Sequence, residues 1–172
     1  MVATTKRHPS RTRIRSGFRK DGQLVALDID FRLDGGAYMT LSPVVLSRGA
    51  LHACGPYVCQ NVRVLARAAA TNAPPHGAFR GFGAPQSVFA IERHLDRAAA
   101  VLGLSPAELR RRNFLRDGLT TATGQVIKDG VDLDALQSRA LQLADYENKQ
   151  AALAQQNKAA AAAGSPLRRG IG

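Results

Sequence analysis

A glycine-rich loop carries the residues of this chain that are best suited to chemistry. Between Pro74 and Gln86, three glycines within seven positions surround Arg80, with Phe79 before it and Phe82 shortly after it. Glycine lets a backbone approach another group closely or adopt positive φ. A helix expected directly after the loop would turn its first amides toward an anion, and Arg80 would add a planar fork of donors. The pattern fits a loop that binds an anionic or flat ligand, and also a tight turn whose phenylalanines fill a core while Arg80 is solvated.

Cysteines and histidines offer a second set of candidates, but their spacing is poor for a metal. Cys54 and Cys59, with His52 nearby, supply only three soft ligands at an unusual spacing. We therefore expect two buried thiols rather than a zinc site. A ligand or base role is conceivable for His76, although a loop histidine without a carboxylate partner is more often neither. His8 is expected to be structural.

Length, charge and composition limit the class of protein. The chain has 172 residues, a net charge of +11, two cysteines and no tryptophan. Its size and its 45% apolar content suit a globular domain, and two cysteines exclude a disulfide-rich secreted scaffold. The sequence has no apolar run of about 18 residues and no apolar segment at its start, so we expect neither a transmembrane helix nor a secretory signal. A soluble cytoplasmic protein without a membrane partner is the expectation.

The positive charge raises the alternative of a basic nucleic-acid-binding module. Seven basic residues and no acid lie within residues 1–20, and Arg110, Arg111 and Arg112 follow one another later. However, the first arginines alternate as on one face of a strand, where aspartates of the next strand would partly neutralise them. A solvated or interdomain face explains the second run better than a nucleic-acid contact does. We therefore expect no specific nucleic-acid partner.

The N-terminal region predicts a β-hairpin. Residues 11–33 alternate apolar with charged side chains on both sides of an Asp21-Gly22 turn. This alternation puts Ile29 and Phe31 on a buried face. Arginines and aspartates of the two strands would then pair on the opposite face.

A further strand and several helices must position the glycine-rich loop. Residues 61–71 alternate as a third strand, which we expect to join the hairpin in one twisted antiparallel sheet. Helices are predicted at 43–53, 86–102, 105–115 and 132–160. Ser42 is the expected cap of the first, and Ser105 begins a capping box followed by proline. Because large apolar residues are lacking after Leu153, we expect the last helix to fray or be disordered beyond it. The predicted fold class is α+β.

The segment Gly77-Ala78-Phe79-Arg80-Gly81-Phe82-Gly83-Ala84-Pro85-Gln86 is specific enough to suggest a family. It closely resembles a signature of the large, molybdopterin-binding subunit of molybdenum hydroxylases, which include xanthine dehydrogenase, aldehyde oxidase and 4-hydroxybenzoyl-CoA reductase. Further segments with similar counterparts in that family are Lys6-Arg7-His8-Pro9, the Asp21-Gly22 turn, Leu46-Ser47-Arg48, His52-Ala53-Cys54-Gly55-Pro56-Tyr57, Thr71-Asn72, Glu92-Arg93, Asp96, Leu109-Arg110 and Arg112-Asn113.

The resemblance also predicts how the chain is organised. It covers about residues 1–147, which would be the central part of the family's molybdopterin-binding domain. Residues 148–172 would form an Ala/Gln-rich helix and a truncated C-terminal segment that looks like the beginning of the family's next strand. The chain starts almost inside the hairpin and stops at Gly-Ile-Gly, so we expect a partial domain of a larger subunit.

The resemblance implies roles for particular residues. Arg80 matches the family arginine that lies beside the molybdenum–pterin centre and orients the substrate, without being an ordinary metal ligand. Its neighbours Phe79 and Gly81 would contact the cofactor. Phe82 matches an aromatic residue that packs on the substrate ring, and Arg48 lies where xanthine-oxidising members carry an arginine that stabilises negative charge on the substrate. Fixed cations in a dry site act most strongly where charge develops, so Arg48 and Arg80 are the expected catalytic residues.

Cofactors and partners follow from the same resemblance. Molybdenum would be bound by molybdopterin in its cytosine dinucleotide or a related form, with iron–sulfur clusters and FAD on other domains or subunits. The enzyme would hydroxylate a carbon with water-derived oxygen, or reductively dehydroxylate one, in an aromatic heterocycle, an aldehyde or an acyl-CoA. The family's catalytic glutamate lies in a glycine-rich motif that this sequence lacks. We therefore expect one wall of a site, inactive without the remainder of the subunit; a nonfunctional truncated gene product is the remaining alternative.

Overall fold

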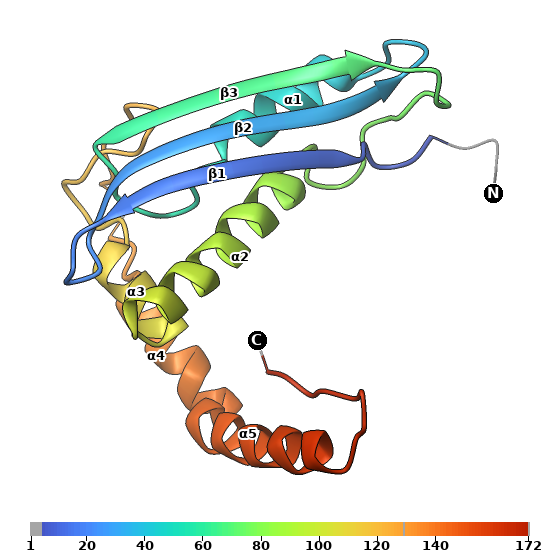
Figure 1. Cartoon of the computed structure of the whole chain (residues 1–172). Coiled ribbons are helices and arrows are strands. Elements are labelled where there is room, and N and C mark those ends of the chain that lie inside the picture. The colour runs from blue at the N-terminus through green and yellow to red at the C-terminus, as the bar shows by residue number, and fades with distance from the viewer. Residues whose placement is uncertain (1–4, 129, 172) are drawn as a thin grey trace. The chain divides into compact units, whose positions relative to one another are not determined.

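The computed structural model describes residues 5–128 and 130–171, which form an α+β fold built on a three-stranded sheet (Figure 1). The strands lie in the order β1-β2-β3. Their bounds are β1 (Ser10–Phe18), β2 (Leu24–Gly36) and β3 (Asn61–Ala70). The helices are α1 (Ser42–Leu51), α2 (Ala84–Leu102), α3 (Pro106–Asn113), α4 (Leu133–Ala144) and α5 (Tyr146–Ala162).

The strands β1 and β2 form the hairpin that the alternation of side chains predicts. They are antiparallel, with Ile14 opposite Ile29 and Arg15 opposite Asp28. Ile29 and Phe31 are buried, at 1% and 0% exposure, whereas Asp28 lies on the opposite, more accessible face. The prediction is confirmed because successive side chains of a strand point to opposite faces, so burial of one face fixes the register.

The third strand corrects the prediction of an all-antiparallel sheet. β3 runs parallel to β2, with Val64 opposite Ile29 and Arg63 opposite Asp28. A parallel neighbour needs a crossover that returns the chain to the same end of the sheet, and the segment containing α1 provides it. The alternation in β3 fixes which face each side chain takes, but it carries no information on the direction of the strand.

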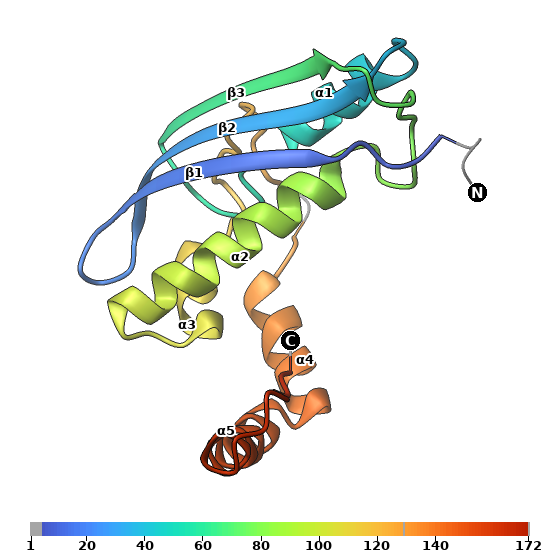
Figure 2. The same ribbon diagram turned by 45° about the vertical axis from the view of Figure 1, so that its right-hand side comes forward.

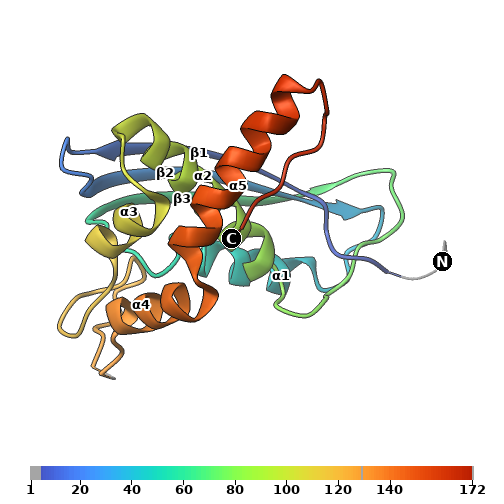
Figure 3. The ribbon, with the colours of Figure 1, turned by 90° about the horizontal axis from the view of Figure 1, so that it is seen from below.

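The helices α1 and α2 cover the same face of the sheet, as Figure 2 and Figure 3 show. The core lies between them and the strands. Phe31 is fully buried there, together with Ile91, Leu95 and Ala99 of α2. Gly49 of α1 lies so close to the Phe31 ring that a Cβ atom would clash with it. The absence of a side chain at Gly49 therefore lets α1 pack directly on the sheet.

Helix caps agree with the sequence at one end and differ at another. Ser105 caps α3 as predicted, because its hydroxyl accepts a hydrogen bond from the Glu108 amide at 3.1 Å. Ser42 is instead the first residue of α1, and its Oγ lies 2.8 Å from His8 Nε2. His8 is 2% exposed, so its expected structural role is confirmed. The Ser42 hydroxyl therefore interacts with the buried His8 and does not cap α1, contrary to the prediction from the local pattern.

The C-terminal region holds two helices where the sequence predicts one over 132–160. Asp132 caps α4, because its carboxylate accepts a hydrogen bond from the Ala135 amide at 2.9 Å. Asp145, with φ of 49°, separates α4 from α5. Because α5 continues to Ala162, the expected fraying or disorder beyond Leu153 is wrong. Alanine has the highest intrinsic helix propensity, which compensates in part for the lack of large apolar side chains.

The chain divides into two compact units, Met1–Val131 and Asp132–Gly172. The composition changes at a different point, between residues 147 and 148. That the family's domain ends there, with a separate segment at 148–172, remains a prediction. The glycine-rich loop, the sheet and α1 to α3 all belong to the first unit. No helix in the described parts of either unit is both long and apolar enough to cross a membrane.

Candidate functional site

The glycine-rich loop reaches the start of α2 through three successive residues with positive φ. The values are 88° at Gly81, 43° at Phe82 and 96° at Gly83. The Phe82 amide donates to the carbonyl of Phe79 at 2.8 Å, and the Ala84 amide donates to that of Gly81 at 3.0 Å. The two glycines adopt the conformation expected of them, whereas positive φ at Phe82 is strained. Such strain is concentrated at functional sites, so it agrees with a functional role for this loop.

Gly83 is also the point at which the loop touches α1. A Cβ atom at Gly83 would clash with the Val45 carbonyl oxygen and would lie 3.1 Å from the Gly49 nitrogen. Arg48 precedes Gly49 in α1 and is exposed. This close approach brings Arg48 and Arg80 onto neighbouring elements. That their guanidinium groups share one ligand remains a prediction.

The aromatic side chains of the loop point outward. Phe79 is 57% exposed and Phe82 is 41% exposed, so neither fills a core. Arg80 is exposed too, and its guanidinium has no hydrogen-bond or ion-pair partner within residues 5–128 and 130–171. The expectation that the phenylalanines of a tight turn fill a core is therefore wrong, whereas Arg80 is solvent-exposed as that alternative also expected.

The start of α2 does not offer the free amides that the sequence predicts. The first-turn amides donate to carbonyls of the preceding turn at 3.0, 3.1 and 3.2 Å, from Ala84, Gln86 and Ser87 respectively. Pro85 has no amide hydrogen. By contrast, the amides of Arg80 and Gly81 have no acceptor in the described part of the chain. Donors for an anion therefore come from the loop backbone and the Arg80 side chain rather than from the helix.

Arg7 holds this loop from its other side, a role that the sequence did not reveal. Its Nη2 donates to the Arg80 carbonyl at 2.9 Å, and its Nη1 donates to Gln86 Oε1 at 3.3 Å. Its guanidinium carbon also lies 4.8 Å from the centre of the Phe79 ring. The one signal in the sequence was that Arg7 falls in a segment resembling the family.

His76, a residue of the loop itself, lies close to a second histidine, His8. The rings of His8 and His76 are 5.9 Å apart, and His76 Nε2 lies 3.6 Å from Asp34 Oδ2. His76 thus has the carboxylate neighbour that the sequence did not suggest. The Thr71 hydroxyl, which donates to Asp34 at 2.6 Å, holds the pKa of that carboxyl below its usual value. Burial lowers the pKa of His8, which favours its neutral form.

The cysteines are buried thiols, as expected. Cys54 and Cys59 are both free, and burial raises the pKa of Cys54 to about 11 and also raises that of Cys59. His52 is exposed and its Nδ1 lies 2.8 Å from the Arg48 carbonyl oxygen. No group of three His, Cys, Asp or Glu side chains is placed to hold a metal ion in the part of the chain that the structure describes.

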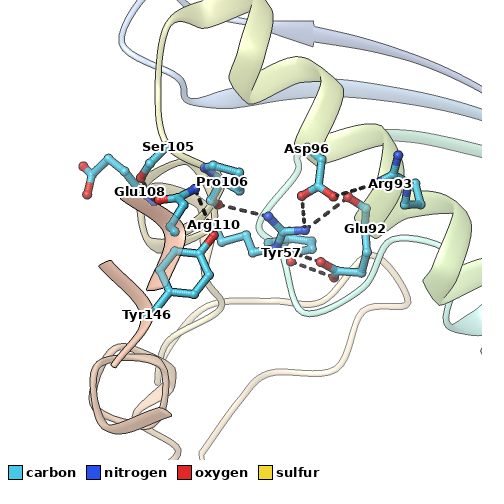
Figure 4. A network of polar contacts seen from close by, with 10 residues as sticks. Tyr57, Glu92, Arg93, Asp96, Ser105, Pro106, Glu108, Arg110 and Tyr146 are labelled. Atoms are coloured by element: carbon cyan, nitrogen blue, oxygen red, sulfur yellow. Dashed lines mark hydrogen bonds and ion pairs between the residues drawn. The ribbon is translucent and has the colours of Figure 1, made fainter. Parts of the chain in front are cut away.

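Of the three consecutive arginines, which were expected on a solvated or interdomain face, Arg111 and Arg112 are exposed but Arg110 is not (Figure 4). Its side chain is only 17% exposed and pairs with Glu92 Oε2 at 2.7 Å and Asp96 Oδ1 at 2.9 Å. The Tyr57 hydroxyl donates to the other oxygen of Glu92 at 2.7 Å. Burial and this carboxylate raise the pKa of Tyr57. The network ties α3 to α2, the helix that begins at the glycine-rich loop.

The outer face of the sheet carries paired charges. Asp28 lies between Arg15 at 2.5 Å and Arg63 at 2.8 Å, and the hydrogen bonds from these arginines lower its pKa to about 2. Asp30 lies likewise between two arginines, Arg32 at 2.6 Å and Arg67 at 3.5 Å. The predicted neutralisation across the strands is confirmed, and it extends to β3.

Comparison with known proteins agrees with these features. A family model described as "Molybdopterin cofactor-binding domain" matches residues 1–114. The nicotinate dehydrogenase large molybdopterin subunit of Eubacterium barkeri is 38% identical over 150 residues, which cover 85% of this chain and 35% of that protein. An aldehyde oxidoreductase of Megalodesulfovibrio gigas is 42% identical over 122 residues, covering 71% and 14% respectively. The chain belongs to the molybdopterin cofactor-binding domain family, and it spans about a third or less of these relatives.

Solved structures give the same assignment. An aldehyde oxidoreductase from Desulfovibrio gigas matches with a TM-score of 0.79 and 35% identity, over 91% of this chain and 16% of that one. Quinoline 2-oxidoreductase from Pseudomonas putida 86 matches with a TM-score of 0.77 and 31% identity, over 91% and 21%. The α+β arrangement around the loop is therefore that of a molybdenum hydroxylase domain.

Proposed function

We propose that the chain supplies one wall of the molybdenum-cofactor and substrate site of an oxidoreductase of the xanthine dehydrogenase and aldehyde oxidase type. The observation that carries the proposal is the loop itself. It presents an exposed Arg80, whose guanidinium has no partner among the described residues, flanked by two exposed aromatic rings, on a domain of the molybdopterin family. A phosphorylated, flat pterin needs donors for its anionic groups and apolar surface for its ring system. The residues present fit such a group.

Each residue has its own task in this proposal. Arg80 and the Gly81 amide would donate hydrogen bonds to the cofactor, and Phe79 would pack beside it, with Arg80 near the metal but not a ligand of it. Phe82 packs on the ring of the substrate. Arg48 stabilises the negative charge that develops on the substrate. The bound molybdenum cofactor supplies the capacity to accept the electrons of substrate oxidation.

The rest of the subunit would complete the site. The chain covers 35% of the nicotinate dehydrogenase subunit and lacks the glycine-rich motif with the catalytic glutamate, so we infer that it is inactive alone. Iron–sulfur clusters and a flavin on other domains or subunits would take up the electrons. The names of the relatives, which refer to nicotinate, xanthine, aldehyde and quinoline, support an aromatic heterocycle or an aldehyde as substrate. An acyl-CoA and the cytosine dinucleotide form of the pterin belong to the same proposal.

A turnover assay tests this function. The chain would replace the corresponding region of a relative's complete subunit, and oxidation of nicotinate, xanthine and benzaldehyde would be followed with a dye as electron acceptor. We expect turnover of at least one substrate, and a loss of about 100-fold or more in kcat for Arg48→Ala, as is typical when a fixed donor to developing charge is removed. The control is Arg13→Ala, on the outer face of the sheet. No oxidation of any substrate, or equal activity of the two variants, would contradict the proposal.

A further inference from the structure

Arg7 contacts the glycine-rich loop at three points on both sides of Arg80. One guanidinium nitrogen donates to the Arg80 carbonyl at 2.9 Å, and the other terminal nitrogen donates to Gln86 Oε1 at 3.3 Å. The flat face of the same group lies 4.8 Å from the centre of the Phe79 ring, within the range of a cation–π interaction. A single side chain therefore binds the middle of the loop, its preceding aromatic residue and the first turn of α2.

The backbone around Arg7 is itself held in place. Arg7 forms a parallel bridge with Gly77, whose amide donates to the Lys6 carbonyl at 3.0 Å. Gln86 Nε2 donates to the carbonyl of His8 at 3.3 Å, and His8 is buried. These bonds hold the peptide group before Arg7 and the one after His8. The backbone that carries the guanidinium is therefore restrained, so the bonds of the guanidinium can restrict the movement of the loop.

The bond from Arg7 to the Arg80 carbonyl has a geometric consequence at Gly81. The carbonyl of Arg80 and the amide of Gly81 belong to one planar trans peptide group and point in opposite directions. Anchoring the carbonyl on Arg7 therefore turns the Gly81 N–H away from the N-terminal segment. That amide has no acceptor within the described residues. It is thus left available, in a set orientation, for a ligand on the far side of the loop.

We propose that Arg7 is the positioning residue of the loop: it orients the peptide between Arg80 and Gly81 so that the Gly81 amide faces the ligand. The identity of that ligand as the molybdenum cofactor rests on the proposed function. The orientation itself rests only on the contacts of Arg7. Glycine at position 81, with φ of 88°, permits the turn in which this peptide group lies. Lysine could not replace Arg7, because a single ammonium cannot reproduce two diverging planar donors and a stacked face.

Hydrogen exchange on the 172-residue chain tests the positioning directly. The amides of Phe82 and Ala84 are bonded within the loop, so their exchange reports its opening. We expect Arg7→Ala to accelerate both by about tenfold and Arg7→Lys to have an intermediate effect, because hydrogen bonds from a charged donor are lost. In Arg7→Ala, the amides of the β1–β2 hairpin should exchange as in the unaltered chain. In the control Arg11→Ala, the two loop amides should also exchange as in the unaltered chain. Unchanged exchange of the two loop amides in Arg7→Ala would overturn the proposal, and Arg7→Lys decides the question if Arg7→Ala does not fold.

A second measurement separates positioning from mere support of the fold. In the complete subunit carrying this chain, we expect Arg7→Ala to lower kcat per bound molybdenum about tenfold with KM unchanged, because the alignment of the loop is altered. A loss of thermal stability with unchanged kcat would assign Arg7 a structural role and overturn the proposal. If the unaltered subunit retains no molybdenum, the proposed function fails, whereas the exchange result still decides whether Arg7 orients the loop.

Discussion

Removing Arg110 should destabilise the domain more than removing any exposed arginine of the same helices. Its guanidinium bonds two carboxylates, at 2.7 Å on Glu92 and 2.9 Å on Asp96, and also the Glu92 and Pro106 carbonyls. Breaking a buried ion pair costs about 3–5 kcal/mol. The two carboxylates here are 31% and 33% exposed, so water recovers part of that loss. We therefore expect Arg110→Ala to lower the free energy of unfolding by about 2–3 kcal/mol.

Urea denaturation of the 172-residue chain, followed by far-ultraviolet circular dichroism, measures this change. The matched control is Arg93→Ala, which removes a 64% exposed arginine from the same Asp96. That variant should stay within about 0.5 kcal/mol of the unaltered chain, as surface pairs usually do. Arg110→Lys should show more than half of the loss of unfolding free energy seen in Arg110→Ala, since an ammonium reaches one carboxylate at a time.

The reasoning attributes the loss to carboxylates left without a cation. A triple variant, Arg110→Met with Glu92→Gln and Asp96→Asn, should therefore recover part of the stability lost in Arg110→Ala. Equal free energies of unfolding for Arg110→Ala and Arg93→Ala would refute the account. So would a triple variant that is less stable than Arg110→Ala.

Three further outcomes are expected. The pKa of Asp28 is lowered from 3.8 to about 2 by Arg63 and Arg15, so its contribution to stability is present above pH 4, on the order of its unfolded pKa, and is lost as the pH falls toward 2. In a plot of the urea midpoint against pH, Asp28→Asn should remove the decrease between pH 4 and pH 2. A plot identical to that of the unaltered chain would argue against the pairing of Asp28 with the arginines. Gly83→Ala should cost about 3 kcal/mol of unfolding free energy but Gly103→Ala only about 1, because a Cβ at Gly83 strikes the Val45 carbonyl whereas Gly103 has open space; equal thermal shifts would show this contact to be unimportant. DNA should bind weakly and lose affinity steeply with salt in fluorescence anisotropy, and tight, sequence-selective binding at physiological salt would oppose the assignment as an enzyme domain.

Local patterns predicted the parts of the fold that depend on near neighbours. The hairpin follows from alternation around Asp21-Gly22, and the cap of α3 follows from Ser105 and Glu108, which are three residues apart. The positive φ of Gly81 and Gly83 was likewise expected from residue type alone. In each case the interaction that decides the structure lies within a few residues of the signal.

Contacts between distant segments account for what the sequence did not show. The direction of β3 depends on the crossover through α1, and the burial of Arg110 depends on Glu92, 18 residues away. Arg7 and the Arg80 carbonyl are 73 residues apart, so no local pattern could pair them. Ser42 was misassigned as a cap for the same reason, because its partner His8 is 34 residues away. The site loop was found from its composition, but the side chain that holds it was not.

Retention of molybdenum by a complete subunit carrying this chain tests the central claim most directly. Molybdenum would be measured by plasma mass spectrometry, and the pterin by fluorescence after oxidation, for the unaltered subunit and for Arg80→Ala and Arg111→Ala. The account predicts stoichiometric molybdenum and pterin in the unaltered subunit and in Arg111→Ala, with a marked loss of cofactor or turnover in Arg80→Ala, since Arg80 projects from the exposed glycine-rich loop and Arg111 lies on α3. Equal cofactor content and turnover in the two variants, or no molybdenum in the unaltered subunit, would contradict the assignment of this loop as a wall of the cofactor site.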